Sequence, residues 1–140
     1  MEWKIMAGRP VYLQLVEQLE RCIVTGVWPA GTRVPPVREL AAEAGVNPNT
    51  MQRALQELEG RGLLQSQRTA GRIVTAGEEQ TRGLRQERAE ELAREFLRQM
   101  RELGCSPEQV RRILQQAQEQ QEQEETRADR MPEGDAAGKS

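Results

Sequence analysis

Apolar residues recur at helical spacing in two stretches near the beginning of the chain. The first stretch, from Pro10 to about Gly26, carries them at Tyr12, Leu15, Val16, Leu19, Cys22 and Ile23. The second is shorter and carries them at Val37, Leu40, Ala41 and Ala44. Spacings of three and four residues place such side chains on one helix face. The pattern therefore predicts two amphipathic helices, the second of which is stopped by Gly45.

A third predicted helix begins directly after Gly45 and Val46. Asn47 is a side-chain acceptor before Pro48, and this pair suits an N-cap followed by the first helical residue. One face of this helix is apolar, with Met51, Ala54, Leu55 and Leu58. The opposite face carries Asn49, Gln52, Arg53 and Gln56. Two helices joined by so short a turn form a helix-turn-helix.

The next segment alternates in the way that strands do. Residues 63–67 and 72–75 are short strand-like runs on either side of a turn that contains Gly71. Such runs predict a β-hairpin. A hairpin directly after a helix-turn-helix is the layout of a winged helix, with Arg68 and Arg72 near the tip of the wing.

Two further apolar stripes follow in the second half of the chain. The first ends at Gly104, and Ser106 and Pro107 then provide a cap and a first helical residue. We predict an antiparallel two-helix hairpin that cannot bury both stripes within itself and pairs with a second copy. The predicted dimerisation residues are Leu92, Phe96, Leu97, Met100, Leu103, Val110, Ile113 and Leu114. Packing of the stripe on the chain's own winged domain, or an effector pocket lined by Phe96, Met100 and Leu103, are the alternatives.

The predicted fold class is mainly α with a small β-hairpin wing (α+β). Residues 1–9 form an N-terminal arm, 10–76 the winged helix-turn-helix domain and 77–118 the helical dimerisation region. Residues 119–140 are acidic and rich in Gln, and among large apolar side chains they hold only Met131. We predict that this tail is disordered.

Composition argues against catalysis and against a metal site. The chain has no histidine and only two cysteines, Cys22 and Cys105, so imidazole bases, Cys/His pairs and metal ligands are scarce. We therefore expect no enzyme activity and no cofactor. No apolar run approaches the roughly 20 residues of a membrane span, and a signal peptide is not evident. The expected location is the cytoplasm, without membrane contact.

The polar face of the third helix has the chemistry of base recognition. Amide side chains such as Gln52 match the N6/N7 edge of adenine, and a guanidinium such as that of Arg53 matches the O6/N7 edge of guanine. A solvated polar surface is the alternative. Residues 1–76 hold nine Lys+Arg against seven Asp+Glu, whereas residues 77–140 hold eleven against fifteen. The half with the polar helix is thus the basic half, as DNA binding requires.

Arg38 is a candidate phosphate ligand near the start of the second helix. A cation there works against the helix dipole, and the positions three and four residues on are Ala41 and Ala42, so the usual acidic partner on the same face is missing. An approaching phosphate would satisfy this arginine, because anions favour helix N-termini.

These residues resemble the N-terminal winged-helix domain of GntR-type bacterial transcription regulators. The resemblance covers about residues 10 to 76. It rests on Pro10-Val11-Tyr12-Leu13-Gln14-Leu15, Gly31-Thr32-Arg33-Val34-Pro35, Val37-Arg38-Glu39-Leu40-Ala41, Gly45-Val46-Asn47-Pro48-Asn49-Thr50, Ala54-Leu55-Gln56-Glu57-Leu58-Glu59 and Gly62-Leu63-Leu64. The Asn-Pro-Asn-Thr motif and the short C-terminal region are similar to those of the YtrA-like branch. The chain departs from the pattern at Pro36, where the family usually has Ser, and at Thr69 and Arg72 in the wing.

The resemblance implies a DNA-binding protein that acts as a homodimer on a palindromic operator of double-stranded DNA. It implies that Arg38 contacts DNA, that Asn47, Asn49, Thr50, Gln52 and Arg53 lie at the groove, and that the wing around Gly71 meets the minor groove. For this branch it also implies target genes linked to membrane transporters. With Gln56, Arg68 and Arg72 from the patterns above, these residues form the predicted DNA site. We expect a repressor, with a small-molecule effector left open; a protein-interaction adaptor built on the same scaffold is the alternative.

Overall fold

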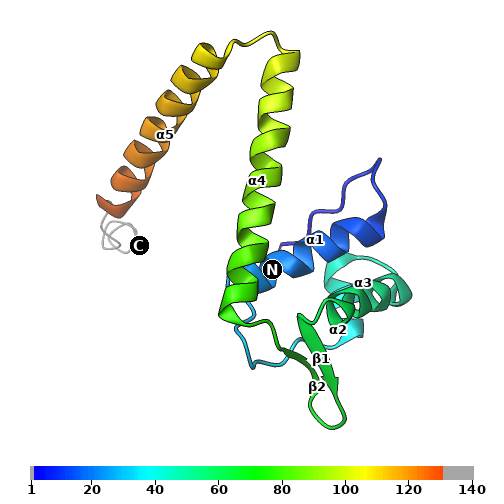
Figure 1. Cartoon of the computed structure of the whole chain (residues 1–140). Helices are drawn as coiled ribbons and strands as arrows, with labels where there is room; N and C mark the ends of the chain where they lie inside the picture. Colours follow the sequence, from blue (N-terminus) through cyan, green and yellow to red (C-terminus); the bar gives the residue numbers. More distant parts are fainter. Residues whose placement is uncertain (1, 131–140) are drawn as a thin grey trace, which may run out of the picture. The chain divides into compact units, whose positions relative to one another are not determined.

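The chain folds into two compact units, Met1–Ala89 and Glu90–Ser140. The computed structural model describes residues 2–130 and confirms the mainly α fold with a two-stranded wing (Figure 1). The elements are α1 (Val11–Val24), α2 (Val37–Ala44), α3 (Pro48–Gly60), β1 (Leu64–Gln67), β2 (Gly71–Val74), α4 (Glu78–Glu102) and α5 (Pro107–Arg130). Within residues 2–130, none of the helices combines the length and apolar composition that crossing a bilayer requires.

The core of the first unit is the meeting point of the three predicted apolar faces. α3 packs against both α1 and α2, and β1 packs against α3. The largest fully buried side chains are Leu15, Leu19, Leu40, Met51, Leu55, Leu58, Leu63 and Val74. Every apolar position predicted for α3 is buried, so its polar face is turned outward.

The wing is an antiparallel hairpin in which Leu64 pairs with Val74 and Gln67 with Gly71. Gly71 has φ +73, a conformation that suits the residue closing a tight hairpin loop and that costs glycine little. The outer edge of β2 is also paired, because the Val34 amide donates to the Arg72 carbonyl and the Val74 amide donates to the Thr32 carbonyl, both at 2.9 Å. This third, short strand-like segment was not predicted from the sequence.

The N-terminal arm is bound to α1 by two glutamines one turn apart. Gln14 is buried, accepts from the Met6 amide at 2.7 Å and donates to the Met6 and Arg9 carbonyls at 2.8 and 2.9 Å. Gln18 exchanges two hydrogen bonds with the backbone of Lys4. The arm is therefore an ordered part of the first unit.

α4 begins at Glu78, close to the predicted start of the helical region at residue 77, but the first compact unit continues to Ala89. Leu84 packs against the core, Gln80 donates to the Arg61 carbonyl and Arg85 to the Val24 carbonyl. The first turns of α4 thus pack on the winged domain.

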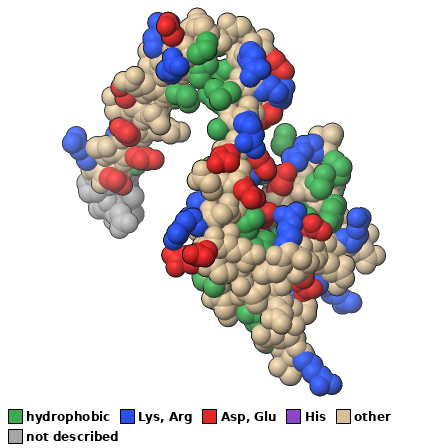
Figure 2. Space-filling view, viewed as in Figure 1, with side chains coloured by type: hydrophobic (Ala, Val, Ile, Leu, Met, Phe, Trp, Pro, Cys, Tyr) green, Lys and Arg blue, Asp and Glu red, His purple; other side chains and the backbone are tan. Residues whose placement is uncertain are grey.

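The second unit has very little core of its own. Among its described residues only Val110 is buried, and hydrophobic side chains gather near the turn between α4 and α5 (Figure 2). α5 begins with the predicted cap, since the Ser106 hydroxyl accepts from the Gln109 amide at 3.2 Å and the Gln109 side chain accepts from the Ser106 amide at 2.8 Å.

The predicted disorder after residue 118 is wrong for residues 119–130, because α5 continues to Arg130. Gln and Glu are good helix formers, and a helix that is already nucleated gains one hydrogen bond for each residue added. Propagation from the cap at Ser106 therefore extends through the polar run. Residues 131–140 of the predicted tail lie outside the described residues.

Candidate nucleic-acid interface

The outer face of α3 presents the polar side chains that the sequence predicts. Asn49, Arg53 and Gln56 are exposed, and Gln52 and Thr50 are half-buried. Because Met51, Ala54, Leu55 and Leu58 hold the opposite face in the core, the helix cannot rotate without losing its packing. The geometry is that of a recognition helix, whose N-terminal residues contact base edges in the major groove.

Asn47 is the N-cap of α3, as predicted. Its side-chain oxygen accepts from the Asn49 amide at 2.8 Å. The acceptor half of the Asn47 amide is therefore used within the protein, while the NH2 group is an exposed donor. The structural role of Asn47 is therefore to cap α3.

Arg53 lies over the ring of Tyr12, with its guanidinium carbon 4.5 Å from the ring centroid. The Tyr12 hydroxyl donates to Glu57 at 3.3 Å, one turn further along α3. This arrangement combines a cation–π contact with a hydrogen bond and reduces the rotamers open to Arg53. The Arg53 side chain is exposed above the ring. Because Tyr12 belongs to α1, this helix helps to position an arginine of α3.

Arg38 occupies the second position of α2 and is exposed. α2 lacks a side-chain cap at Pro36, which agrees with the departure from the family's Ser. The first-turn amides and Arg38 together offer donors to an anion at this helix end. α2 packs on α3, so Arg38 and the polar face of α3 belong to the same domain.

The wing contributes Arg68 and a residue that the sequence analysis missed. Arg68 is exposed in the turn between β1 and β2. Arg33 is also exposed, and its guanidinium lies against Gly71, with Nε 3.6 Å from the position that a Cβ on Gly71 would take. The extended segment before Pro35 brings Arg33 there by pairing with Ile73. The available signal was the Thr32-Arg33-Val34 run, which alternates like an edge strand.

Arg72, also predicted to lie at the DNA, makes an ion pair within the domain. Its Nε pairs with Glu59 of α3 at 2.9 Å, and its side chain is 15% exposed. The Ser66 hydroxyl donates to the same carboxylate. Arg72 therefore links the wing to the end of α3, because the half-buried carboxylate of Glu59 forms a charge-assisted hydrogen bond with its guanidinium.

Comparison with known proteins identifies the domain. Residues 11–74 match the gntR family of bacterial regulatory proteins. The chain is 32% identical to the uncharacterized HTH-type transcriptional regulator YhcF of Bacillus subtilis, over 79% of this chain and 91% of that protein. It is 33% identical to the HTH-type transcriptional repressor YtrA of the same organism, over 49% of this chain and 53% of YtrA.

A solved structure agrees over most of the chain. The GntR family transcriptional regulator from Listeria monocytogenes is 32% identical, covers 80% of this chain and 98% of its own, and superposes with a TM-score of 0.72. The similarity thus extends beyond the winged domain into the helical region. The chain belongs to the GntR family and is a DNA-binding transcriptional regulator.

Proposed function

We propose that the protein is a homodimeric repressor that binds a palindromic operator. The observation that carries this proposal is the combination of an outward polar face on α3 with an apolar face on the second unit that a single chain leaves exposed. The polar face of α3 recognises bases, and the apolar face of the second unit binds a second copy of the chain. A symmetric pair can present two recognition helices about one DNA turn, roughly 34 Å, apart.

Recognition divides between two classes of contact. Asn49, Gln52 and Arg53 read base edges in the major groove, with Asn47, Thr50 and Gln56 beside them. Arg38, Arg68 and Arg33 bind phosphates, and Gly71 lets the wing approach the DNA backbone closely. Base contacts give sequence preference, whereas phosphate contacts give affinity that falls as salt rises.

Dimerisation is supported by the exposure of large apolar side chains along α4 and α5. Leu103 is 78% exposed, Leu92 53%, Leu97 47%, Ile113 43% and Leu114 40%. An exposed apolar stripe of this length is costly in water and marks an interaction surface. Phe96 and Met100 are half-buried and Val110 is buried. These three residues continue the apolar stripe near the turn. A second copy with the same stripe is the partner that two-fold symmetry favours.

Repression is the mode that we propose, because the related YtrA is named a transcriptional repressor. The chain spans about half of YtrA, so this support concerns the DNA-binding half. A dimer on an operator that overlaps a promoter would block access to it. Genes linked to membrane transporters are the targets that the YtrA-like resemblance implies.

Two substitutions test the recognition scheme on duplexes selected from random DNA. Arg38→Ala removes a phosphate contact, so it should weaken specific and non-specific binding alike and reduce the salt slope by about one. Gln52→Ala should cost about 1–3 kcal/mol on the selected duplex and relax preference at one position in each half-site. Arg94→Ala, on the exposed surface of α4, is the control and should bind as the natural chain does.

The same measurement separates the regulator from an adaptor. Binding should discriminate the selected duplex from a scrambled one at physiological salt. If the natural chain bound both duplexes equally and lost both at moderate salt, base recognition by α3 would be ruled out and the adaptor would be favoured.

A further inference from the structure

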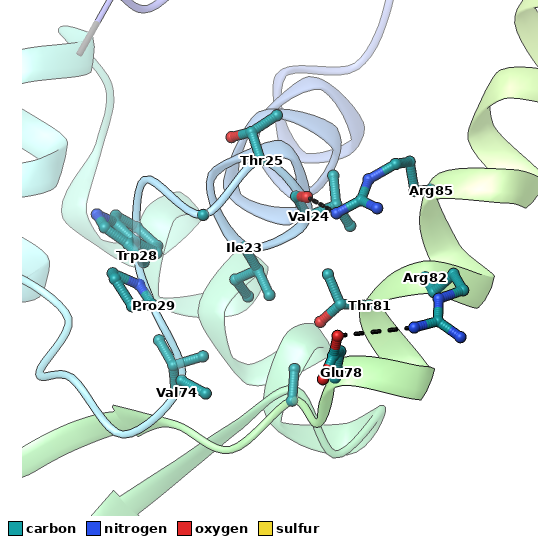
Figure 3. A pocket seen from close by; sticks show the side chains of 13 residues that line it. Ile23, Val24, Thr25, Trp28, Pro29, Val74, Glu78, Thr81, Arg82 and Arg85 are labelled. Atoms are coloured by element: carbon teal, nitrogen blue, oxygen red, sulfur yellow. Dashed lines mark hydrogen bonds and ion pairs between the residues drawn. The ribbon is translucent and has the colours of Figure 1, made fainter.

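A pocket of about 350 Å³ lies where the winged domain meets the first turns of α4 (Figure 3). Its lining comes from the end of α1, the loop that follows, the end of β2 and residues 78–85 of α4, all within the first compact unit. The volume is in the range of small-molecule sites. Among the residues of the alternative effector pocket at Phe96, Met100 and Leu103, Leu103 is 78% exposed.

One side of the pocket is apolar and firmly held. Ile23 and Val74 belong to the buried core, and Trp28 packs against that core. The loop is fixed because the Trp28 amide donates to the Cys22 carbonyl at 2.9 Å and the Gly31 amide donates to the Val74 carbonyl at 2.8 Å. This wall is a preformed surface for the apolar body of a ligand.

The facing side is polar and carries a net positive charge. α4 contributes Glu78, Thr81, Arg82 and Arg85, so the lining has two guanidiniums and one carboxylate. Arg85 donates to the Val24 carbonyl at 2.7 Å, and a guanidinium has five N–H donors, of which this bond uses one. The Arg82–Glu78 pair is long, at 3.6 Å, and exposed, so an incoming carboxylate can compete for Arg82.

We propose that this pocket binds a small carboxylic acid with an apolar body. The carboxylate lies between Arg82 and Arg85 with the Thr81 hydroxyl as a further donor, and the body lies on Ile23, Trp28 and Val74. Arg82 and Arg85 are three residues apart on one helix, so their side chains are neighbours. A planar guanidinium binds a carboxylate more strongly than it binds a neutral group. The proposed ligand therefore carries a negative charge.

We expect a ligand in this pocket to change operator affinity through α4. This consequence rests on the proposed function. The ligand contacts the winged domain on one side and α4 on the other, and α4 is a single helix from Glu78 to Glu102 that enters the second unit. A ligand that strengthens this contact favours one direction of α4 relative to the winged domain. The spacing of the two recognition helices, and hence operator affinity, changes with it.

Benzoate is a suitable probe, with benzyl alcohol and acetate as matched compounds that lack the charge or the apolar body. In nitrogen-15 NMR of the full chain, benzoate should shift the Trp28 indole signal and the amides of residues 23–30 and 78–85. The dissociation constant should be on the order of 1 mM, the scale for a ligand of about nine non-hydrogen atoms. Trp3→Phe identifies the Trp28 signal, because the chain has two tryptophans.

Variants show whether the arginines create the site. The double variant Arg82→Gln/Arg85→Gln should bind benzoate about tenfold more weakly or worse, while Arg94→Gln, further along α4, should bind it unchanged. Equal affinity for benzyl alcohol, shifts scattered over the surface, or unchanged benzoate binding by the double variant would each overturn the site.

Operator binding tests the coupling separately. Saturating sodium benzoate should change operator affinity at least about threefold relative to equimolar sodium acetate, and the double variant should not respond. An unchanged operator affinity with benzoate bound would overturn the coupling. Failure of the ligand-free protein to bind any selected duplex would instead overturn the proposed function, since the NMR titration involves no DNA.

Discussion

In the interface that we propose, single side chains contribute both to the fold and to DNA binding. Asn47 caps α3 with its oxygen, which leaves its NH2 group for the groove. Arg53 is held over Tyr12, so a base or phosphate meets a guanidinium whose position is already restricted. Preorganisation of this kind lowers the conformational entropy lost on binding.

Substitutions at Asn47 separate its contribution to stability from its proposed contribution to DNA binding. Asn47→Ala should lower the free energy of unfolding by about 1 kcal/mol, because a capping acceptor is lost. Asn47→Asp keeps an acceptor and should stay within about 0.5 kcal/mol of the natural chain, yet it should weaken operator binding roughly tenfold by replacing a donor with an anion near phosphates. Urea unfolding and fluorescence anisotropy with labelled DNA measure the two effects. Full operator affinity in Asn47→Asp would show that this side chain does not approach the DNA.

At the scale of elements, the sequence predicts those features that depend on residues close together in the chain. The apolar faces of α1, α2 and α3, the Asn47 and Ser106 caps and the hairpin follow from residues within a few positions of each other. The Arg72–Glu59 pair joins residues 13 positions apart, and the pairing of residues 32–34 with β2 joins segments about forty positions apart. Those contacts depend on tertiary packing, so the sequence predicted neither the ion pair of Arg72 with Glu59 nor the position of Arg33 beside the wing.

The attachment of the arm to α1 is likewise a tertiary feature with a measurable energy. Gln14→Ala removes three hydrogen bonds between a buried amide and the arm. It should lower the free energy of unfolding by about 1–3 kcal/mol, because three backbone groups of the arm lose their hydrogen-bond partner. Gln65→Ala, at an exposed position of β1, is the control and should change stability by less than about 0.5 kcal/mol. Equal urea midpoints for the two variants would mean that the arm is not held in solution.

At the scale of the whole molecule, the two units differ in what they lack. The first has a closed core, whereas the second buries only Val110 among its described residues and exposes its apolar stripe. A helix with an exposed apolar stripe gains most of its stability from packing against a partner. We therefore propose that the stability of the second unit depends on dimerisation, whereas that of the first does not.

Ile113→Glu tests this dependence without disturbing the fold of one chain. Ile113 is 43% exposed, so a charge there costs little in a monomer but is buried in the proposed interface, where an unpaired carboxylate costs several kcal/mol. The variant should sediment at the 15.9 kDa of one chain at concentrations where the natural chain is a dimer. Gln116→Glu adds the same charge at an exposed position of the same helix and should remain dimeric.

The stoichiometry of the complex with DNA tests the central claim most directly, and sedimentation of the full chain with a duplex that carries the selected operator measures it. We expect two chains on each duplex for the natural protein and for Gln116→Glu, with operator affinity lost in Ile113→Glu. One chain on each duplex, bound with the same affinity by Ile113→Glu, would contradict the account of a dimer that aims two α3 helices at one operator.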